Sequence, residues 1–251
     1  MTGLATTETE LLTFASQVNV AIGNVFEDLR TLSSAVSDMW MDHGADNGAF
    51  CEADLSALDA MIKPLLYCEH LKLHGAGIVF APGQVAGKGM HLEWWCRGAG
   101  QTVSPLRLNF NRQSERFYDY EAMPWYVQAR QSRQPCAAGP FVDLHGTEQY
   151  IVAFSLPIYV EDRFLGVAAA DLCLDSLETL LVKGLMRVSN EALVLNAEGR
   201  VLAANTVSWL AGDLVGPQEG AGNTRSCHVG TQAHPFWTVV EHSNPRTAIA
   251  L

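Results

Sequence analysis

Two aspartates and a group of aromatic residues are the side chains of this sequence best suited to binding chemistry. Asp143 and Asp171 each follow a short apolar run, and the aromatic residues lie between positions 94 and 141: Trp94, Trp95, Tyr118, Trp125, Tyr126 and Phe141. A carboxylate balances the charge of an ammonium group, and each aromatic ring attracts a cation by on the order of 0.5–2 kcal/mol. Around one cavity, these residues would form a site for a small cation.

Taken one at a time, the same residues have ordinary structural roles. Tryptophan and tyrosine in a mixed domain usually belong to the core. Asp143 is also suited to a turn, Asp171 to capping a following helix, and Met123, within the same aromatic stretch, to filling a gap. A binding function therefore depends on whether the fold brings these residues together.

Signatures of catalytic sites are incomplete or missing. His91-Leu92-Glu93 with Pro135-Cys136 is similar to the zinc deaminase signature, but Gly139 stands where the second cysteine is required. His70 and His74 are four residues apart without a glutamate in the metalloprotease position, and the sequence has no P-loop and no G-x-S-x-G. The sequence predicts a non-catalytic protein without a metal or cofactor, with a cryptic enzyme as an alternative.

Charge and composition narrow the class of partner. The 251 residues include 16 basic and 27 acidic side chains, for a net charge of −11. This balance argues against binding nucleic acid or anionic lipid, and it favours cationic small ligands. No stretch has the roughly 18 apolar residues of a membrane span, and residues 1–10 lack the features of a secretory signal. Six scattered cysteines predict buried free thiols in a reducing compartment, so a cytoplasmic location is expected.

One long helix is predicted over residues 8–42. Its apolar residues recur at alternating steps of four and three: Leu11, Ala15, Val18, Ile22, Val25, Leu29, Leu32, Val36 and Met39. This is a heptad seam. Two alternatives follow: the helix lies across its own domain, or the seam joins two copies into a homodimer.

The remaining chain shows strand patterns without regular strand–helix alternation, which predicts an α+β fold with antiparallel sheets. A helix is expected over 52–68, broken or kinked near Pro64. Strands are then expected at 77–81, 92–97, 106–111, 139–143, 150–159 and 164–171, with a short helix within 118–131. Further strands are expected at 191–196, 201–204 and 236–240. The expected organisation is a long helix (1–45), a first module (46–174), a linker helix (175–187) and a smaller second module (188–251).

Three passages together resemble the double Cache, or PDC-type, sensor domains of bacterial receptors. They are Tyr118–Tyr126, Gly139–Asp143, and the strand pair running from Pro157–Tyr159 through Gly166–Asp171. The run 193–204 is similar to the hairpin that opens the second module of these proteins. The resemblance covers nearly the whole chain. It implies a long N-terminal helix and two PAS-like modules, with the ligand held by the first.

The resemblance also implies roles for individual residues. Amino-acid sensors of this family clamp the ligand carboxylate with an arginine and hold its ammonium group with tyrosines and two aspartates. Here the arginine position is Met123 and one tyrosine position is Phe141, whereas Tyr118, Trp125, Tyr126, Asp143 and Asp171 match the pattern. Methionine lacks the bidentate donors of arginine. The expected ligand is therefore a small amine or quaternary ammonium compound, such as ethanolamine, choline or a biogenic amine.

This ligand is expected to contact the matching residues together with Phe141, Met123, Trp94 and Trp95. An amino-acid or other carboxylate sensor of the same fold is one alternative, and a structural scaffold is another. No output domain is evident, so a separate signalling or regulatory protein is an expected partner. Family members are mostly extracytoplasmic, which makes an excised extracytoplasmic domain of a membrane receptor the alternative location.

Overall fold

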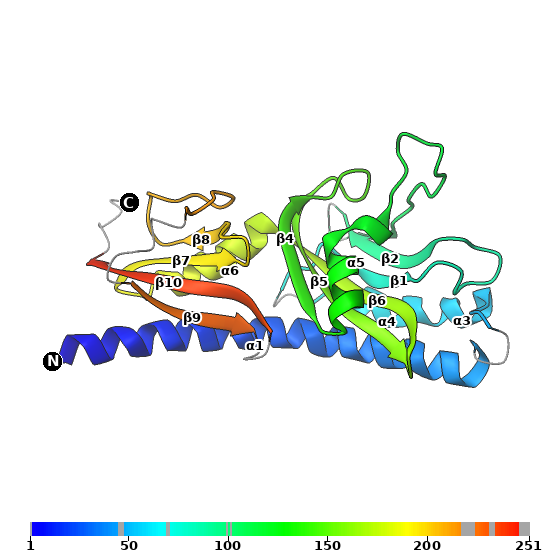
Figure 1. Cartoon of the computed structure of the whole chain (residues 1–251), viewed down its shortest axis with the longest axis horizontal. Helices are drawn as coiled ribbons and strands as arrows, with labels where there is room; N and C mark the ends of the chain where they lie inside the picture. Colours follow the sequence, from blue (N-terminus) through cyan, green and yellow to red (C-terminus); the bar gives the residue numbers. More distant parts are fainter. Residues whose placement is uncertain are drawn as a thin grey trace. The chain divides into compact units, whose positions relative to one another are not determined.

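A long helix and two antiparallel sheets make up the fold (Figure 1). The computed structural model describes residues 2–44, 48–68, 71–98, 100, 102–216, 224–230 and 234–245. Helix α1 spans Thr2–Met39 and ends in one π-helical turn, η1 (Trp40–Gly44). The predicted α+β class and the long N-terminal helix are confirmed.

The larger of two compact units holds residues 24–173 and a six-stranded sheet. Its strands are β1 (Gly75–Phe80), β2 (His91–Arg97), β3 (Val103–Pro105), β4 (Cys136–Val142), β5 (Tyr150–Val160) and β6 (Arg163–Cys173). They lie in the order β3-β2-β1-β6-β5-β4 with antiparallel pairing. Its other helices are α3 (Glu52–Ser56), α4 (Leu58–Leu65), η3 (Tyr120–Ala122) and α5 (Pro124–Ser132).

The smaller unit holds residues 1–23 and 174–251. Its elements are α6 (Leu174–Leu185), β7 (Asn190–Asn196), β8 (Val201–Ala204), β9 (Thr224–Gly230) and β10 (Pro235–Pro245), with strand order β8-β7-β10-β9. The first part of α1 is tied to this unit: the amide of Ser189 donates to the Glu10 carboxylate over 3.0 Å, and that of Gly230 donates to Asn19 Oδ1 over 2.7 Å. Helix α1 therefore contributes residues to both units.

The apolar seam of α1 packs within its own chain. Leu11, Ala15, Val18, Ile22, Val25, Leu29, Leu32 and Val36 are each at most 4% exposed, and only Met39 is half-buried. In the larger unit, for example, the ring of Phe26 meets that of Phe154 edge-on at 5.9 Å. The seam thus serves the fold of one chain. A homodimer through this helix stays a prediction, and it would require another face of α1.

Several boundaries differ from the sequence-based expectations. Residues 106–111 lie outside the sheet as an irregular segment, and β3 covers only the three residues before them. The helix expected over 52–68 is interrupted at Ala57 rather than at Pro64, which lies in the last turn of α4. Strand β9 was not predicted because its sequence is mostly polar and only Val229 is fully buried. Of the six cysteines, none forms a disulfide, as expected, but Cys51 and Cys68 are exposed rather than buried.

Replacing Leu29 by alanine is expected to destabilise the protein by about 2–5 kcal/mol, because Leu29 is 0% exposed and its removal leaves a cavity. Urea unfolding followed by circular dichroism measures this change. Met41→Ala is the control: Met41 is 64% exposed, so the free energy of unfolding should change by no more than about 0.5 kcal/mol. Equal effects of the two substitutions would contradict the packing of the seam.

Candidate ligand-binding site

A cavity lies on the face of the six-stranded sheet that α5 covers. Its lining residues are Val79, Leu92, Trp94, Leu106, Leu108, Tyr118, Tyr120, Trp125, Asp143, Ile151, Ala169 and Asp171. The cavity volume is about 20 Å³, which is about the space of one water molecule. A larger ligand therefore requires side chains of the wall to move.

Strand alternation explains why these side chains meet. Residues two apart on a strand share a face of the sheet. Leu92 and Trp94 therefore point into the cavity from β2, as Ala169 and Asp171 do from β6. Ala169 is small, so it leaves space at the centre of the sheet beside Val79. The irregular segment between β3 and η3 and the start of α5 supply the opposite wall.

Asp143 is held firmly by its own loop and by a tyrosine. It is 3% exposed, and Tyr118 Oη donates to its Oδ1 over 2.5 Å. Thr147 donates to Oδ2 with its amide over 2.7 Å and with its hydroxyl over 3.1 Å. A Cβ atom at Gly146 would overlap this carboxylate, so the loop needs glycine there. Burial, and then the charge of Asp143, raise the pKa of the Tyr118 phenol above its ordinary value.

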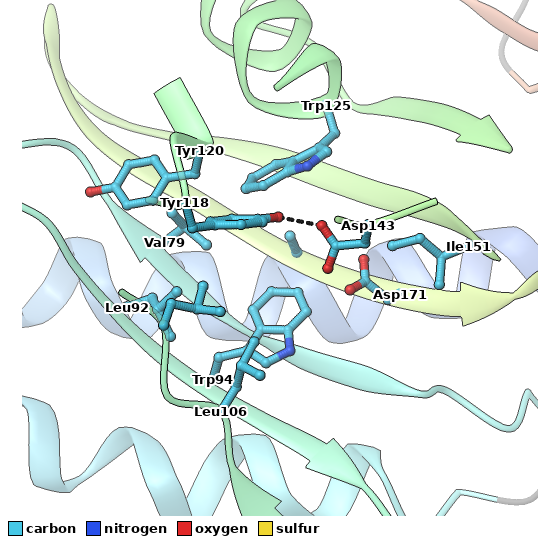
Figure 2. A pocket seen from close by; sticks show the side chains of 12 residues that line it. Val79, Leu92, Trp94, Leu106, Tyr118, Tyr120, Trp125, Asp143, Ile151 and Asp171 are labelled. Atoms are coloured by element: carbon cyan, nitrogen blue, oxygen red, sulfur yellow. Dashed lines mark hydrogen bonds between the residues drawn. The ribbon is translucent and has the colours of Figure 1, made fainter. Parts of the chain in front are cut away.

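Asp171 lies in the same cavity, but its carboxyl group differs from that of Asp143 in its hydrogen bonds. It is 6% exposed, and no described residue donates a hydrogen bond to its carboxyl group, although its backbone oxygen accepts one from the His74 amide. Burial raises the pKa of Asp171 well above its ordinary value, and the negative charge of Asp143 raises it further. Figure 2 shows the two carboxyl groups side by side, with the rings of Trp94, Tyr118 and Trp125 nearby.

Within the described part of the chain, the lining of this cavity contains two carboxyl groups and no lysine or arginine. Buried carboxyl groups of this kind are stabilised by a positive charge brought next to them. The surrounding aromatic rings add attraction for a cation. The chemistry of the cavity is therefore that of a site for a small cationic group with an apolar body.

Five of the residues proposed from the sequence line this cavity, and four do not. Trp94, Tyr118, Trp125, Asp143 and Asp171 are brought together by the fold. Trp95, Met123, Tyr126 and Phe141 lie outside the lining.

Trp95 points to the opposite face of the sheet because it neighbours Trp94 on a strand. There its indole N–H donates to Asp59 Oδ1 over 2.8 Å, and Lys63 Nζ lies 3.7 Å from the ring centroid. These contacts attach β2 to α4. Trp95 is therefore a structural residue in this fold.

Tyr126, Met123 and Phe141 belong to the packing around the cavity. Tyr126 is fully buried, with its ring 5.3 Å from that of Tyr120 and 5.5 Å from that of Phe164. Met123 is the N-cap residue of α5, and both Met123 and Phe141 pack as partly buried side chains against the cluster that contains Tyr126. These three residues pack against the lining residues without lining the cavity themselves.

Tyr120 also lines the cavity, although it is not among the site residues predicted from the sequence. It is fully buried, its hydroxyl donates to the Phe80 carbonyl over 2.8 Å, and the His91 amide donates to that hydroxyl over 3.3 Å. Burial raises its pKa to about 12. Leu106 and Leu108 were also missed. Their spacing of two was a signal that they share one side of an extended segment.

A protein-family model matches residues 62–179. The matching model is the first PDC sensor domain of methyl-accepting chemotaxis protein-like proteins. Residues 62–179 form a PDC sensor domain. This segment contains every lining residue of the cavity. The family predicted from the three sequence passages is thereby confirmed at the level of the domain.

Solved structures extend the likeness of this PDC protein to nearly the whole chain. Methyl-accepting chemotaxis protein X superposes with a TM-score of 0.64 at 18% identity, covering 94% of this chain and 95% of that one. The extracellular domain assigned to the histidine kinase mmHK1S-Z3 superposes with a TM-score of 0.64 at 15% identity, and the match covers 95% of this chain and 93% of that one. The ligand-binding domain of the Pseudomonas aeruginosa PAO1 amino-acid chemoreceptor PctC, in complex with GABA, superposes with a TM-score of 0.58 at 19% identity. This match covers 96% of this chain and 98% of that one. The fold is the double Cache fold, as predicted.

Among the helices of the described ranges, none is long and apolar enough to cross a membrane. His70, which precedes His74 by four residues in the sequence, lies outside the described residues.

Proposed function

We propose that this PDC protein is the ligand-binding part of a sensor and that its ligand is a small molecule with a positively charged amine. The observation that carries this proposal is the pair Asp143 and Asp171, buried side by side in an aromatic cavity whose described lining has no positive charge. A cationic ligand would supply the missing charge. Trp94, Tyr118 and Trp125 would face it.

The same cavity favours an amine without a carboxylate. A ligand carboxylate taken into an apolar site needs a cation or several hydrogen-bond donors. Position 123, where the family pattern has arginine, is a methionine outside the lining. We therefore favour a primary, biogenic or quaternary amine, as the sequence suggested.

An amino acid is the second candidate ligand. PctC, a chemoreceptor for amino acids by its name, was solved with GABA, which carries both an amine and a carboxylate. In that case the carboxylate would have to bind at a position other than that of the missing arginine. The ammonium group would still lie in the part of the cavity that contains the two aspartates.

The proposed location is extracytoplasmic, as part of a receptor that passes the signal to another domain or protein. The likeness to an extracellular domain of a histidine kinase supports this location. The cytoplasmic location expected from the sequence has no support among the similar proteins. A homodimer would be compatible with such a receptor.

A thermal-shift screen of the purified chain tests the proposal. The panel contains choline, ethanolamine and phenethylamine, with L-valine, GABA and acetate as the carboxylate-bearing comparison. A ligand at about 100 times its Kd stabilises by about 2.7 kcal/mol, which corresponds to about 5–10 °C for a chain of this size. We expect shifts with the amines, and no shift with any of them in Asp171→Ala.

Each other result has a defined meaning. Shifts with L-valine and GABA alone would favour the second candidate. A panel without any shift would overturn the sensor proposal in favour of a structural scaffold. A shift with acetate alone would contradict the cationic site.

A further inference from the structure

The two carboxyl groups of the cavity differ in how they are held. Both oxygens of Asp143 accept hydrogen bonds: Oδ1 from Tyr118, and Oδ2 twice from Thr147. No described residue donates to the carboxyl group of Asp171. One cavity thus contains a carboxylate that is already occupied and a carboxyl group that is available.

The contacts of Asp143 belong to the loop between β4 and β5. The Asp143 backbone oxygen accepts hydrogen bonds from the amides of Gly146 (3.2 Å) and Glu148 (2.9 Å), and the Asp143 amide donates to the Gln149 oxygen (2.9 Å). With the side-chain bonds to Thr147, these contacts fix the loop around the carboxylate. The bond from Tyr118 then holds the phenol ring against the cavity. Asp143 therefore has a structural task that uses most of its capacity to accept hydrogen bonds.

The surroundings of Asp171 favour its neutral form. The polar and titratable groups around it are the Asp143 carboxylate, the Tyr118 phenol from the segment before η3, the Cys96 thiol on β2 and the Cys173 thiol on its own strand. Across β1, its pairing partner Gly75 has no side chain, and His74 contributes an amide to its backbone oxygen. None of the described residues that line the cavity is a lysine or an arginine. Burial raises the pKa of Asp171 well above its ordinary value, so these surroundings favour a bound proton.

We propose that Asp171 is the group that binds the ligand's cation and that it gives up its proton when it does so, whereas Asp143 is a positioning residue for Tyr118 and the 143–149 loop. This inference rests on the proposed function of the site. The step is balanced: the carboxylic acid of Asp171 and the cation become a carboxylate–cation pair, and one proton passes to the solvent. Binding would therefore tighten as the pH rises.

Isothermal titration calorimetry with choline at pH 7 tests whether a proton is released when the ligand binds. Choline carries a permanent charge and no titratable ammonium proton, so any proton released comes from the protein. Repeating the titration in buffers of different ionisation enthalpy counts these protons. We expect close to one proton released per choline bound. Binding of choline without proton release would show that Asp171 does not lose a proton on binding, and it would leave the proposed function intact.

A measurement on the protein without ligand tests the same point independently. Infrared difference spectroscopy at pH 7 should show a protonated carboxyl band that Asp171→Asn lacks and Asp143→Asn retains. A spectrum without such a band would overturn the protonation of Asp171. A band together with no binding of choline or the other amines would instead overturn the proposed amine ligand.

Variants separate the binding group from the positioning residue. Asp171→Asn should weaken choline binding at least 100-fold. Asp143→Asn and Thr147→Val should weaken it less than about tenfold and keep the release of one proton. If Asp143→Asn removes both binding and proton release while its circular dichroism stays native, the division of roles is wrong.

Discussion

Replacing Asp171 by asparagine is expected to raise the free energy of unfolding at neutral pH by about 1–3 kcal/mol, because folding requires Asp171 to bind a proton or to bury its charge, and asparagine requires neither. Asp171 is 6% exposed beside a second carboxylate, with no described donor to stabilise its charge. Asparagine has nearly the same shape and no charge. A substitution that abolishes ligand binding would thus stabilise the ligand-free fold.

The pH dependence of this effect has a defined sign. The pKa of Asp171 is raised in the folded state, so its contribution to stability is fully present below the ordinary pKa of about 4 and is lost as the pH rises through the folded-state pKa. The stability difference between Asp171→Asn and wild type should therefore be small near pH 3.5 and should grow at higher pH. Urea unfolding of both proteins at several pH values measures it. A difference that does not vary with pH would contradict the raised pKa.

Replacing Trp94 by alanine is expected to abolish amine binding and to destabilise the protein by about 3–5 kcal/mol. Trp94 is 6% exposed and forms part of the cavity wall. Its loss removes a ring that would face the cation and enlarges the cavity. Thermal shifts with choline, and urea unfolding of the ligand-free protein, measure the two effects separately.

The neighbouring tryptophan provides a matched control. Trp95→Ala removes an indole of the same size from the other face of the sheet, where it contacts Asp59 and Lys63. It should cost about 1–2 kcal/mol of stability, mainly from the lost hydrogen bond, and leave the thermal shift with choline in place. Loss of binding in Trp95→Ala with retention in Trp94→Ala would show that the site is on the opposite face.

Local patterns in the sequence were sufficient for most of the fold. The heptad seam of α1 and the long apolar runs of β5 and β6 identify their elements because burial follows the period of the backbone. The strand β9 and the irregular segment 106–111 were not predicted correctly. Strand β9 is a mostly polar edge strand that is stabilised by pairing with the next strand, β10, and it lacks the apolar alternation by which a strand is recognised in a sequence.

The sequence also predicted only part of the candidate site, because residue types are visible in a sequence and the faces to which they point are not. The sequence placed Asp143 and Asp171 at the ends of their strands and predicted the aromatic residues near them. It could not distinguish Trp94 from Trp95, because the register of β2 against β1 decides which of two neighbours faces the cavity. It also could not distinguish Tyr120, whose ring lines the cavity, from Tyr126, which packs behind it.

The sequence by itself determined the α+β class, the family of the sensor domain, and the set of acidic and aromatic residues from which the site is built. These properties depend on residue types and spacings that the chain carries locally. Only the tertiary structure decided that the α1 seam packs within one chain. It also decided that the Asp143 carboxylate accepts hydrogen bonds from Tyr118 and Thr147, whereas no described residue donates one to the carboxyl group of Asp171. Hydrogen-bond partners and burial arise from contacts between distant segments, and these contacts exist only in the folded chain.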